Sequence, residues 1–375
     1  MKIICDSRKL TDAFLLAGAV APQRSPKEIL RNVKLVAENG TLTLTATDME
    51  VGIRVVVDSG IDIVTEGVVL LPVAKTSAIL RENTDESITI ESNGNATQIA
   101  AARSKYKLQT ETPDEFPSIN ATIGEKHLEI PARLLGAMIR RTAFATDSES
   151  SRYALGGINF ETDGDSLIAV GTDGRRLAKF SGPVVLHGDC SISGGAAIVP
   201  TRAATLIERA IGAKPDDLIR VCCTLNEISV ESPNCLIVSR LVEGRYPNWR
   251  QAMPKREAPS TVSVLAGPLH AAVRQAAIAT DNESRGVLCT FSETSLRLEA
   301  KTADIGESSV ELPVAGDFTD SGSITTQVNS QYVTDFLKVI DTEANITIEI
   351  ESANTPVTMG TDDGYDYVIM PMAKN

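Results

Sequence analysis

One pattern of apolar and polar residues recurs three times in this chain, at a period of about 125 to 130 residues. Each copy opens on a helix that is predicted from apolar residues at positions i, i+3 and i+4. These triplets are Leu10, Ala13 and Phe14, then Leu134, Ala137 and Met138, then Leu269, Ala272 and Val273. A repeat this long can enclose a core of its own, so each copy is expected to be a domain and not a solenoid unit.

Three further signals keep the same spacing. The first is an alternating strand that ends on a turn aspartate, at Asp48, Asp173 and Asp304. The second is a helix after an extended segment, with equivalent positions at Ile79, Ile207 and Phe336. The third is a strand in a hairpin, written SITIES, EISVES and NITIEIES, before a closing proline at Pro117, Pro247 and Pro371. The chain is therefore predicted to be α+β, with the order helix, strands, helix, strands in each copy.

Polar stretches between the copies, TIGEKH and PKREAPS, place three domains at 1–123, 124–255 and 256–375. Domains in a row leave unpaired edge strands at both ends of the array, and such an edge can accept a strand from another copy. Head-to-tail pairing of this kind closes into a ring when the rotation per domain is suitable. A sequence pattern does not contain that angle, so it leaves both a ring and an open string possible.

Composition narrows the classes of function. The net charge of −13 argues against a uniformly basic surface for nucleic acid, but an acidic protein can still carry a basic face. The six cysteines form no CxxC pair and the three histidines are scattered, so we expect reduced thiols, no metal and no cofactor. With neither a signal peptide nor a run of about eighteen apolar residues, the chain is expected to be cytoplasmic, with no membrane partner.

Three sequence blocks carry a family resemblance. They are Thr172-Asp173-Gly174-Arg175-Arg176-Leu177, Leu241-Val242-Glu243-Gly244-Arg245-Tyr246-Pro247 and Tyr367-Val368-Ile369-Met370-Pro371-Met372. With these blocks in the correct thirds of the repeat, the chain resembles the beta subunit of bacterial DNA polymerase III, the sliding clamp. The resemblance implies three clamp-type (processivity fold) domains in a head-to-tail homodimeric ring, with helices lining a central hole and antiparallel sheets outside. It also implies a non-catalytic factor that encircles double-stranded DNA without sequence preference.

The resemblance further implies that partners insert a short peptide into one hydrophobic cleft between the second and third domains. These partners are the replicative DNA polymerase alpha subunit, a separate ATP-dependent clamp loader, repair polymerases, ligase and mismatch-repair proteins. The cleft carried over to this chain is Arg152, Leu155, Thr172, Gly174, Arg175, Arg176, Leu177, Pro247, Val368, Ile369, Met370, Pro371 and Met372. Methionines offer an adaptable apolar wall, and Arg176 is expected to reach a peptide carboxylate or carbonyl.

Two reservations apply to this cleft. The alternative for Leu155, Leu177 and Val368 is an ordinary core position. The chain also departs from the family at Gln251 and Ala252, where a further arginine or an aliphatic residue is common, and this departure leaves its peptide preference at the rim open.

The hole and the dimer seam complete the set of candidate sites. Attraction to phosphate without base readout needs Lys and Arg, and the residues predicted to bind DNA are Arg24, Arg103, Lys105, Tyr153, Arg202 and Arg285. The resemblance implies a seam in which Lys75, Tyr106 and Leu108 face Ile278 and Glu307 of another copy. The alternatives are solvated surface charges for the first set and an ordinary edge strand for the second.

Two rival functions were weighed. An enzyme with a carboxylate site built from Asp48, Asp173 and Asp304 is disfavoured, because the repeat puts these residues in separate domains and an Asx turn explains them. No P-loop, GxSxG or HExxH motif is present either. A β-rich adhesion or scaffold protein is disfavoured because the sequence shows no export signal. That function would also leave the apolar segment near residue 370 without a role.

Overall fold

The computed structural model describes residues 1–94, 96–119, 122–147, 153–193, 195, 197–212, 215–256, 259–281, 283–318 and 322–372, with the backbone alone at residue 153. The chain divides into two compact units. The first unit comprises Met1–Gly136, Val184–Ser191 and Arg202–Leu241, and the second comprises Ala137–Pro183, Ile192–Thr201 and Val242–Asn375.

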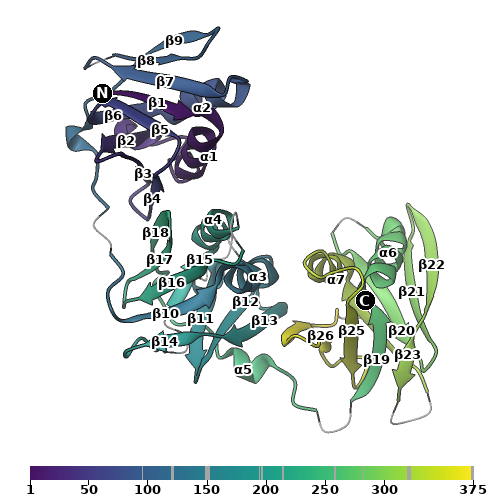
Figure 1. Ribbon diagram of the computed structural model, residues 1–375. Helices are drawn as coiled ribbons and strands as arrows, with labels where there is room; N and C mark the ends of the chain where they lie inside the picture. Colours follow the sequence, from purple (N-terminus) through teal and green to yellow (C-terminus); the bar gives the residue numbers. More distant parts are fainter. Residues whose placement is uncertain are drawn as a thin grey trace. The chain divides into compact units, whose positions relative to one another are not determined.

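The first repeat begins with a strand in which buried and more exposed residues alternate. The helix that follows is capped by Asp6, whose carboxylate accepts a hydrogen bond from the Lys9 backbone N–H at 2.9 Å. Its elements are β1 (Lys2–Asp6), α1 (Ser7–Gly18), β2 (Asn32–Glu38), β3 (Thr41–Thr47), β4 (Val51–Val57), β5 (Ile61–Thr65), β6 (Gly67–Pro72), α2 (Val73–Glu82), β7 (Ser87–Ser92), β8 (Ala96–Ala100) and β9 (Lys105–Gln109). The two helices contact each other, and α1 covers β2, β3 and β4 (Figure 1).

The second repeat keeps the same order of elements. They are β10 (His127–Pro131), α3 (Ala132–Ala143), β11 (Gly157–Asp163), β12 (Ser166–Thr172), β13 (Arg176–Pro183), β14 (Val185–His187), β15 (Ala197–Pro200), α4 (Thr201–Ile211), β16 (Leu218–Cys223), β17 (Glu227–Ser232) and β18 (Cys235–Arg240). A short additional helix, α5 (Trp249–Ala252), follows the repeat.

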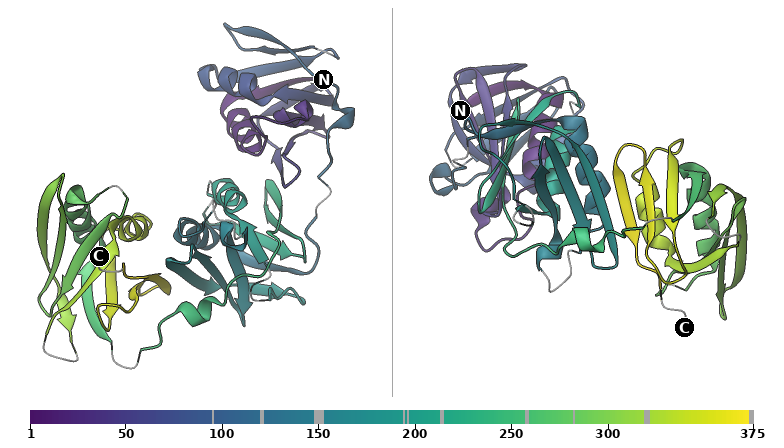
Figure 2. Two further views of the ribbon diagram at one scale, coloured as in Figure 1. Left: turned by 180° about the vertical axis from the view of Figure 1, so that it is seen from behind. Right: turned by 90° about the horizontal axis from the view of Figure 1, so that it is seen from below.

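The third repeat has the same order again, and its helices α6 and α7 lie side by side against the sheets (Figures 1 and 2). Its elements are β19 (Ser260–Leu265), α6 (Ala266–Ala276), β20 (Gly286–Phe291), β21 (Ser295–Thr302), β22 (Gly306–Pro313), β23 (Ala315–Asp317), β24 (Ile324–Asn329), α7 (Ser330–Leu337), β25 (Asn345–Ile350), β26 (Val357–Thr361) and β27 (Tyr365–Ile369). The threefold repeat predicted from sequence is thus confirmed in the order of elements.

Every repeat contributes one five-stranded and one four-stranded antiparallel sheet, and some of these sheets are continuous across repeats. The five-stranded sheet of the second repeat joins the four-stranded sheet of the first through β18 and β4. The five-stranded sheet of the third repeat joins the four-stranded sheet of the second through β27 and β13. This pairing explains why the two units divide the middle repeat: each of its sheets is hydrogen-bonded to a different neighbour.

Two details of the sequence prediction are wrong. In α3 the buried face is formed by Leu135, Met138 and Ile139, whereas Leu134 and Ala137 are half-buried, so the predicted face is off by about one residue. The segment EISVES forms β17, which lies between β16 and β18 in its sheet. The strand of the second repeat that is equivalent to SITIES is β16. Adjacent strands with the same alternation give the same pattern, and only pairing distinguishes them.

The cysteines are free thiols, as the sequence analysis expected, and Cys5, Cys235 and Cys289 are buried.

Candidate functional site

The junction between β13 and β27 brings two of the three sequence blocks together. The strands pair antiparallel, with Arg176 opposite Ile369 and Leu177 opposite Val368. Beyond the strand, the Met370 backbone N–H donates to the Arg175 carbonyl at 2.9 Å, and the Met372 N–H donates to the Gln327 carbonyl at 2.8 Å. The last described residues are therefore held against the sheet.

A tight turn precedes β13 and presents the Thr172–Arg176 block. The Asp173 carboxylate accepts hydrogen bonds from the backbone N–H groups of Arg175 and Arg176 at 2.9 and 3.0 Å, and the Thr172 hydroxyl accepts from Gly174 N–H at 3.1 Å. Gly174 has φ of +86°, a conformation that glycine adopts without a steric penalty. The turn explains both the aspartate and the glycine of the block without a catalytic role.

The first repeat contains the same turn at Thr47–Val51. The Asp48 carboxylate accepts from Glu50 and Val51 N–H at 3.0 and 2.7 Å, but Met49, with φ of +80°, takes the place of the glycine. Asp48 and Asp173 therefore have the predicted turn role, whereas the turn near Asp304 has a hydrogen bond from Ile305 N–H to the Thr302 hydroxyl.

An apolar cluster lies beneath this junction. Leu177 and Val368 are buried in it, and the Tyr246 hydroxyl donates to the Val170 carbonyl at 3.1 Å. Trp249, the first residue of α5, is 7% exposed and lies in the same cluster. The block around Tyr246 thus packs against the strands of the junction. Burial of a tryptophan side chain stabilises the folded state by about 3 to 5 kcal/mol relative to alanine.

The predicted cleft residues divide by burial. Leu155, Thr172, Leu177, Val368 and Ile369 are buried, which favours the core alternative for these side chains. Met370 is 48% exposed, and Gly174, Arg175, Pro247, Gln251 and Ala252 are also exposed. Pro371 and Met372 are half-buried, and Arg152 lies outside the described residues. The exposed part of the predicted cleft is therefore Met370, the turn residues Gly174 and Arg175, and Pro247, with Gln251 and Ala252 exposed nearby.

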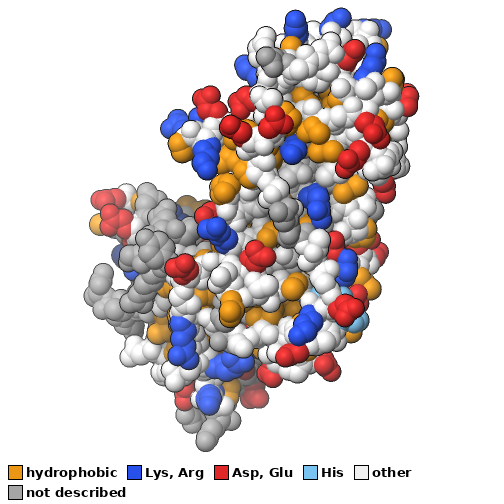
Figure 3. Space-filling view, turned by 90° about the vertical axis from the view of Figure 1, so that its left-hand side faces the viewer, with side chains coloured by type: hydrophobic (Ala, Val, Ile, Leu, Met, Phe, Trp, Pro, Cys, Tyr) orange, Lys and Arg blue, Asp and Glu red, His pale blue; other side chains and the backbone are white. Residues whose placement is uncertain are grey.

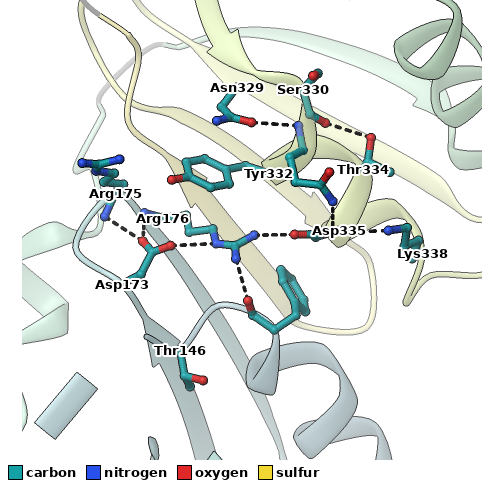
Figure 4. A network of polar contacts seen from close by, with 12 residues as sticks. Thr146, Asp173, Arg175, Arg176, Asn329, Ser330, Tyr332, Thr334, Asp335 and Lys338 are labelled. Carbon is teal, nitrogen blue, oxygen red and sulfur yellow. Dashed lines mark hydrogen bonds and ion pairs between the residues drawn. The ribbon is translucent and has the colours of Figure 1, made fainter. Parts of the chain in front are cut away.

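Arg176 has a different environment from the one expected (Figure 4). Its guanidinium donates to Asp173 at 3.0 Å, to Asp335 on α7 at 2.9 Å and to the Phe144 carbonyl at 2.6 Å. It also lies over the Tyr332 ring, 4.5 Å from its centroid. Burial lowers the pKa of Arg176, but Tyr367, Asp335 and Asp173 raise it more, so the side chain is held charged. Arg176 joins the second repeat to the third, and three hydrogen bonds from its guanidinium are made within the chain.

The residues predicted to bind DNA have unequal surroundings. Arg24 is exposed in a loop, and Arg103 is exposed in the loop before β9, the strand on which Lys105 is also exposed. Arg202 pairs with Asp48 at 2.5 Å and donates to the Val20 carbonyl at 3.1 Å. Arg285 donates to Gln331 at 2.8 Å. The side chain of Tyr153 is outside the described part of the chain.

Three of the residues predicted for the seam, Tyr106, Leu108 and Glu307, lie on edge strands, and the other two lie on helical segments. Tyr106 and Leu108 are on β9, with Tyr106 40% exposed, and Lys75 is exposed on α2. Ile278, in the short helical turn Ala277–Ala279, is 74% exposed, and Glu307 on β22 forms an exposed ion pair with Lys301 at 2.9 Å.

Sequence reasoning missed Asp335, Tyr332 and Phe144 around Arg176, because they come from elements far away in the chain. It also missed the meeting of two histidines, His127 and His187, with Glu129. The only signal for the second group was the spacing His-x-Glu at residues 127–129, which the structure places on β10 and the distant His187 completes.

The fold and this site define a class of protein: repeated α+β domains of the processivity type, joined by continuous antiparallel sheets. Family models of the DNA polymerase III beta subunit match residues 1–120 (N-terminal domain), 129–248 (central domain) and 250–373 (C-terminal domain). The chain therefore belongs to the DNA polymerase III beta subunit family, the sliding clamps. This family consists of processivity factors and not of catalytic enzymes.

Individual relatives agree with the family models. The chain is 26% identical to the beta sliding clamp of Synechococcus elongatus, over 99% of both chains, and 27% identical to that of Vibrio cholerae, over 99% of this chain and 100% of the relative. The crystal structure of the DNA polymerase III subunit beta from Pseudomonas aeruginosa matches with a TM-score of 0.88 and 26% identity over 100% of both chains. A sliding clamp from the same species bound to griselimycin matches with a TM-score of 0.90 and 25% identity over 100% of both chains. Among the described residues, no helix has the length and apolar character of a membrane span.

Proposed function

We propose that this chain forms a head-to-tail dimeric ring in the cytoplasm, encircles duplex DNA and tethers the replicative polymerase through the surface around Met370. One observation supports the ring above all others: the same strand junction occurs twice within the chain and leaves one unpaired edge of each kind. The last strand of the second repeat, β18, pairs with β4 of the first, and the last strand of the third, β27, pairs with β13 of the second. The last strand of the first repeat, β9, and the strand of the third repeat that corresponds to β4 and β13, β22, are sheet edges.

The two internal junctions supply a register for the missing one. Ile237 on β18 lies opposite Ile53, and Tyr367 on β27 lies opposite Ala178. Tyr106 is the residue of β9 that corresponds to Ile237 and Tyr367, as the pairing within each hairpin shows. Tyr106 lies opposite Ile99, Ile237 opposite Val230, and Tyr367 opposite Met359. Ser308 is the residue of β22 that corresponds to Ile53 and Ala178 on the same grounds. Ser308 lies opposite Ala300 on the preceding strand, Ile53 opposite Ala46, and Ala178 opposite Gly171. The proposed seam therefore sets Tyr106 opposite Ser308 of a second copy.

This register pairs opposite charges. Continuing antiparallel from Tyr106 and Ser308, Lys107 comes opposite Glu307 and Arg103 comes opposite Glu311, with Lys105 between them. Facing pairs of opposite charge contribute about 0.2 to 1 kcal/mol each. The exposed apolar side chains Tyr106 and Ile278 would be covered in the same step. The register assigns Arg103 and Lys105 to the seam, so Arg24, Tyr153, Arg202 and Arg285 remain as the proposed contacts to DNA.

The partner surface is proposed on similar grounds. Exposed Met370 gives an adaptable apolar contact, and it adjoins an exposed turn whose Gly174 carries no side chain to obstruct a peptide backbone. The proposed occupants are peptides of the replicative polymerase alpha subunit, the clamp loader, repair polymerases, ligase and mismatch-repair proteins. Ring opening is assigned to the separate ATP-dependent loader. Tethering raises the local concentration of polymerase at the primer end, so the ring needs no high affinity for DNA.

The decisive experiment loads the full chain onto a closed circular DNA with a clamp loader and ATP, and follows retention after gel filtration at high salt. A closed ring stays on the circle and is lost when a restriction enzyme cuts the DNA once. The matched control is the linear DNA with both ends blocked by bulky proteins, which should retain the ring. Equal loss from circular and cut DNA would contradict encirclement, since binding by charge alone does not depend on ends.

A further inference from the structure

Three side chains that can bind a metal converge on the edge of the sheet in the first unit. Strands β10 and β14 pair antiparallel, with His127 directly opposite His187 and Glu129 opposite Val185. Because side chains alternate along a strand, His127 and Glu129 project from the same face, and His187 joins them from the neighbouring strand. Two of the chain's three histidines therefore meet at one carboxylate.

The distances bring one ligand atom of each residue into a single cluster. His187 Nε2 lies 3.1 Å from Glu129 Oε2, and His127 Nε2 lies 3.6 Å from Glu129 Oε1. The imidazole rings are stacked, with centroids 4.7 Å apart and an interplanar angle of 22°. One donor atom from each of the three residues lies within 4.8 Å of the others. The exposed fractions of the side chains of His127, Glu129 and His187 are 12%, 29% and 42%, so an ion can enter and the rings can adjust.

The hydrogen bonds around the cluster leave its inner nitrogens available. His127 Nδ1 lies 2.9 Å from the Gly124 carbonyl, which requires the proton on Nδ1 in the neutral ring and leaves a lone pair on Nε2. His187 Nε2 is shielded from solvent and has no hydrogen-bond partner of acceptable geometry, in spite of its short distance to Glu129. When neither ring carries a proton on Nε2, two imidazole lone pairs face the Glu129 carboxylate, and a divalent cation can replace the protons that would otherwise bridge these atoms.

Two basic residues lie near the cluster. Arg220 on β16 lies opposite Glu129 in the sheet, but its guanidinium forms an ion pair with Glu231. Lys126 precedes the cluster, and its aliphatic stem lies 3.3 Å from the position that a Cβ on Gly188 would take. In Figure 3, which shows one face of the protein, a histidine side chain reaches the surface beside acidic and basic side chains.

We propose that His127, Glu129 and His187 bind a divalent transition metal, zinc by preference. Two imidazole nitrogens and one carboxylate oxygen form a ligand set typical of zinc, with further positions left for water. Bond lengths of about 2.0 to 2.2 Å require the two rings to tilt toward a common point. The bound ion would join β14, an edge strand of residues Val185–His187, to β10, and so stabilise the free edge of this sheet.

The test titrates the tag-free, metal-stripped full chain with Zn²⁺ by calorimetry and with Co²⁺ by visible absorption. We expect one ion per chain, a higher Tm with Zn²⁺, and a Co²⁺ spectrum without a thiolate charge-transfer band. The variants His187→Ala and Glu129→Gln should each weaken binding by more than about 100-fold, since even partners behind the ligands change affinity by about 10- to 100-fold.

The control is His270→Gln, which changes the remaining histidine and should bind as the unaltered chain does. Circular dichroism of the metal-free variants separates loss of a ligand from loss of fold, and a variant with an unaltered metal-free Tm that still loses binding supports the site. Equal affinity in the unaltered chain and His187→Ala, or a thiolate band from a cysteine site, would overturn the proposal. Because ring formation does not enter this assay, its failure leaves the proposed clamp function untouched.

Discussion

Removal of Arg176 should weaken the connection between the second and third repeats far more than removal of a surface arginine. The side chains of Arg176, Asp173 and Asp335 are only 10%, 15% and 19% exposed, so their ion pairs are little screened by solvent. Loss of one partner of such a buried pair costs about 3 to 5 kcal/mol, because the remaining charge stays buried. We therefore expect Arg176→Ala and Asp335→Ala each to lower the free energy of unfolding by an amount in that range.

The assay is urea unfolding followed by the fluorescence of Trp249, the single tryptophan, which lies in the apolar cluster beneath the same junction. The double variant should be more stable than the sum of the single losses predicts, with a coupling energy of about 1 to 3 kcal/mol. The control is Arg297→Ala, which breaks a pair whose side chains are 51% and 53% exposed and should cost less than about 1 kcal/mol. Strict additivity of Arg176→Ala and Asp335→Ala would refute the reasoning, because it would mean that the pair contributes no interaction of its own.

Four other predictions concern separate parts of the molecule. At the proposed seam, Lys107→Glu should weaken the dimer by about 4- to 900-fold, because each ring has two seams and each reversal replaces an attraction with a repulsion of about 0.2 to 1 kcal/mol. Adding Glu307→Lys should restore it, and sedimentation that shows the double variant to be as dissociated as the single ones would exclude the register. At the partner surface, Met370→Asp should abolish binding of a fluorescent polymerase peptide without lowering the Tm, whereas Leu225→Asp, at a residue of the first unit that is 95% exposed, should leave binding intact; equal effects would remove Met370 from the site. In the two equivalent turns, Met49→Gly should raise the free energy of unfolding by up to about 1 kcal/mol and Gly174→Met should lower it by about 1 to 2 kcal/mol, because both positions have φ near +80°. Thermal melting with the opposite signs would show that a side chain at these positions does not strain the backbone. Burial raises the pKa of Cys235 and Cys289 from 9.0 to about 12, which favours the neutral thiol in the folded state; stability from this source is complete below pH 9 and falls as the pH rises from 9 toward 12. Alkylation of these thiols at pH 8 should therefore require unfolding, and rapid labelling of the native protein would contradict their burial.

The sequence by itself determined the repeat, the class of fold and the local elements. Period-2 alternation identified β3 and β21 because residues on one face of a strand must be apolar wherever that face is buried, whereas β12 is buried along nearly its whole length. The turn role of Asp48 and Asp173 followed from chemistry within a few residues, because an aspartate can satisfy the N–H groups of its own turn. Such features depend on neighbours in the chain, and a sequence displays those directly.

Tertiary structure alone decided which distant residues meet. It gave Arg176 a partner in Asp335 on α7, buried Leu177 and Val368 while leaving Met370 exposed, and set His187 beside His127. It also showed which strands pair across repeats, and hence which edges remain free for a second copy. The physical reason is common to all of these cases: strand pairing joins segments regardless of their separation in the chain, and alternation records which face of a strand is buried but not which strand lies beside it.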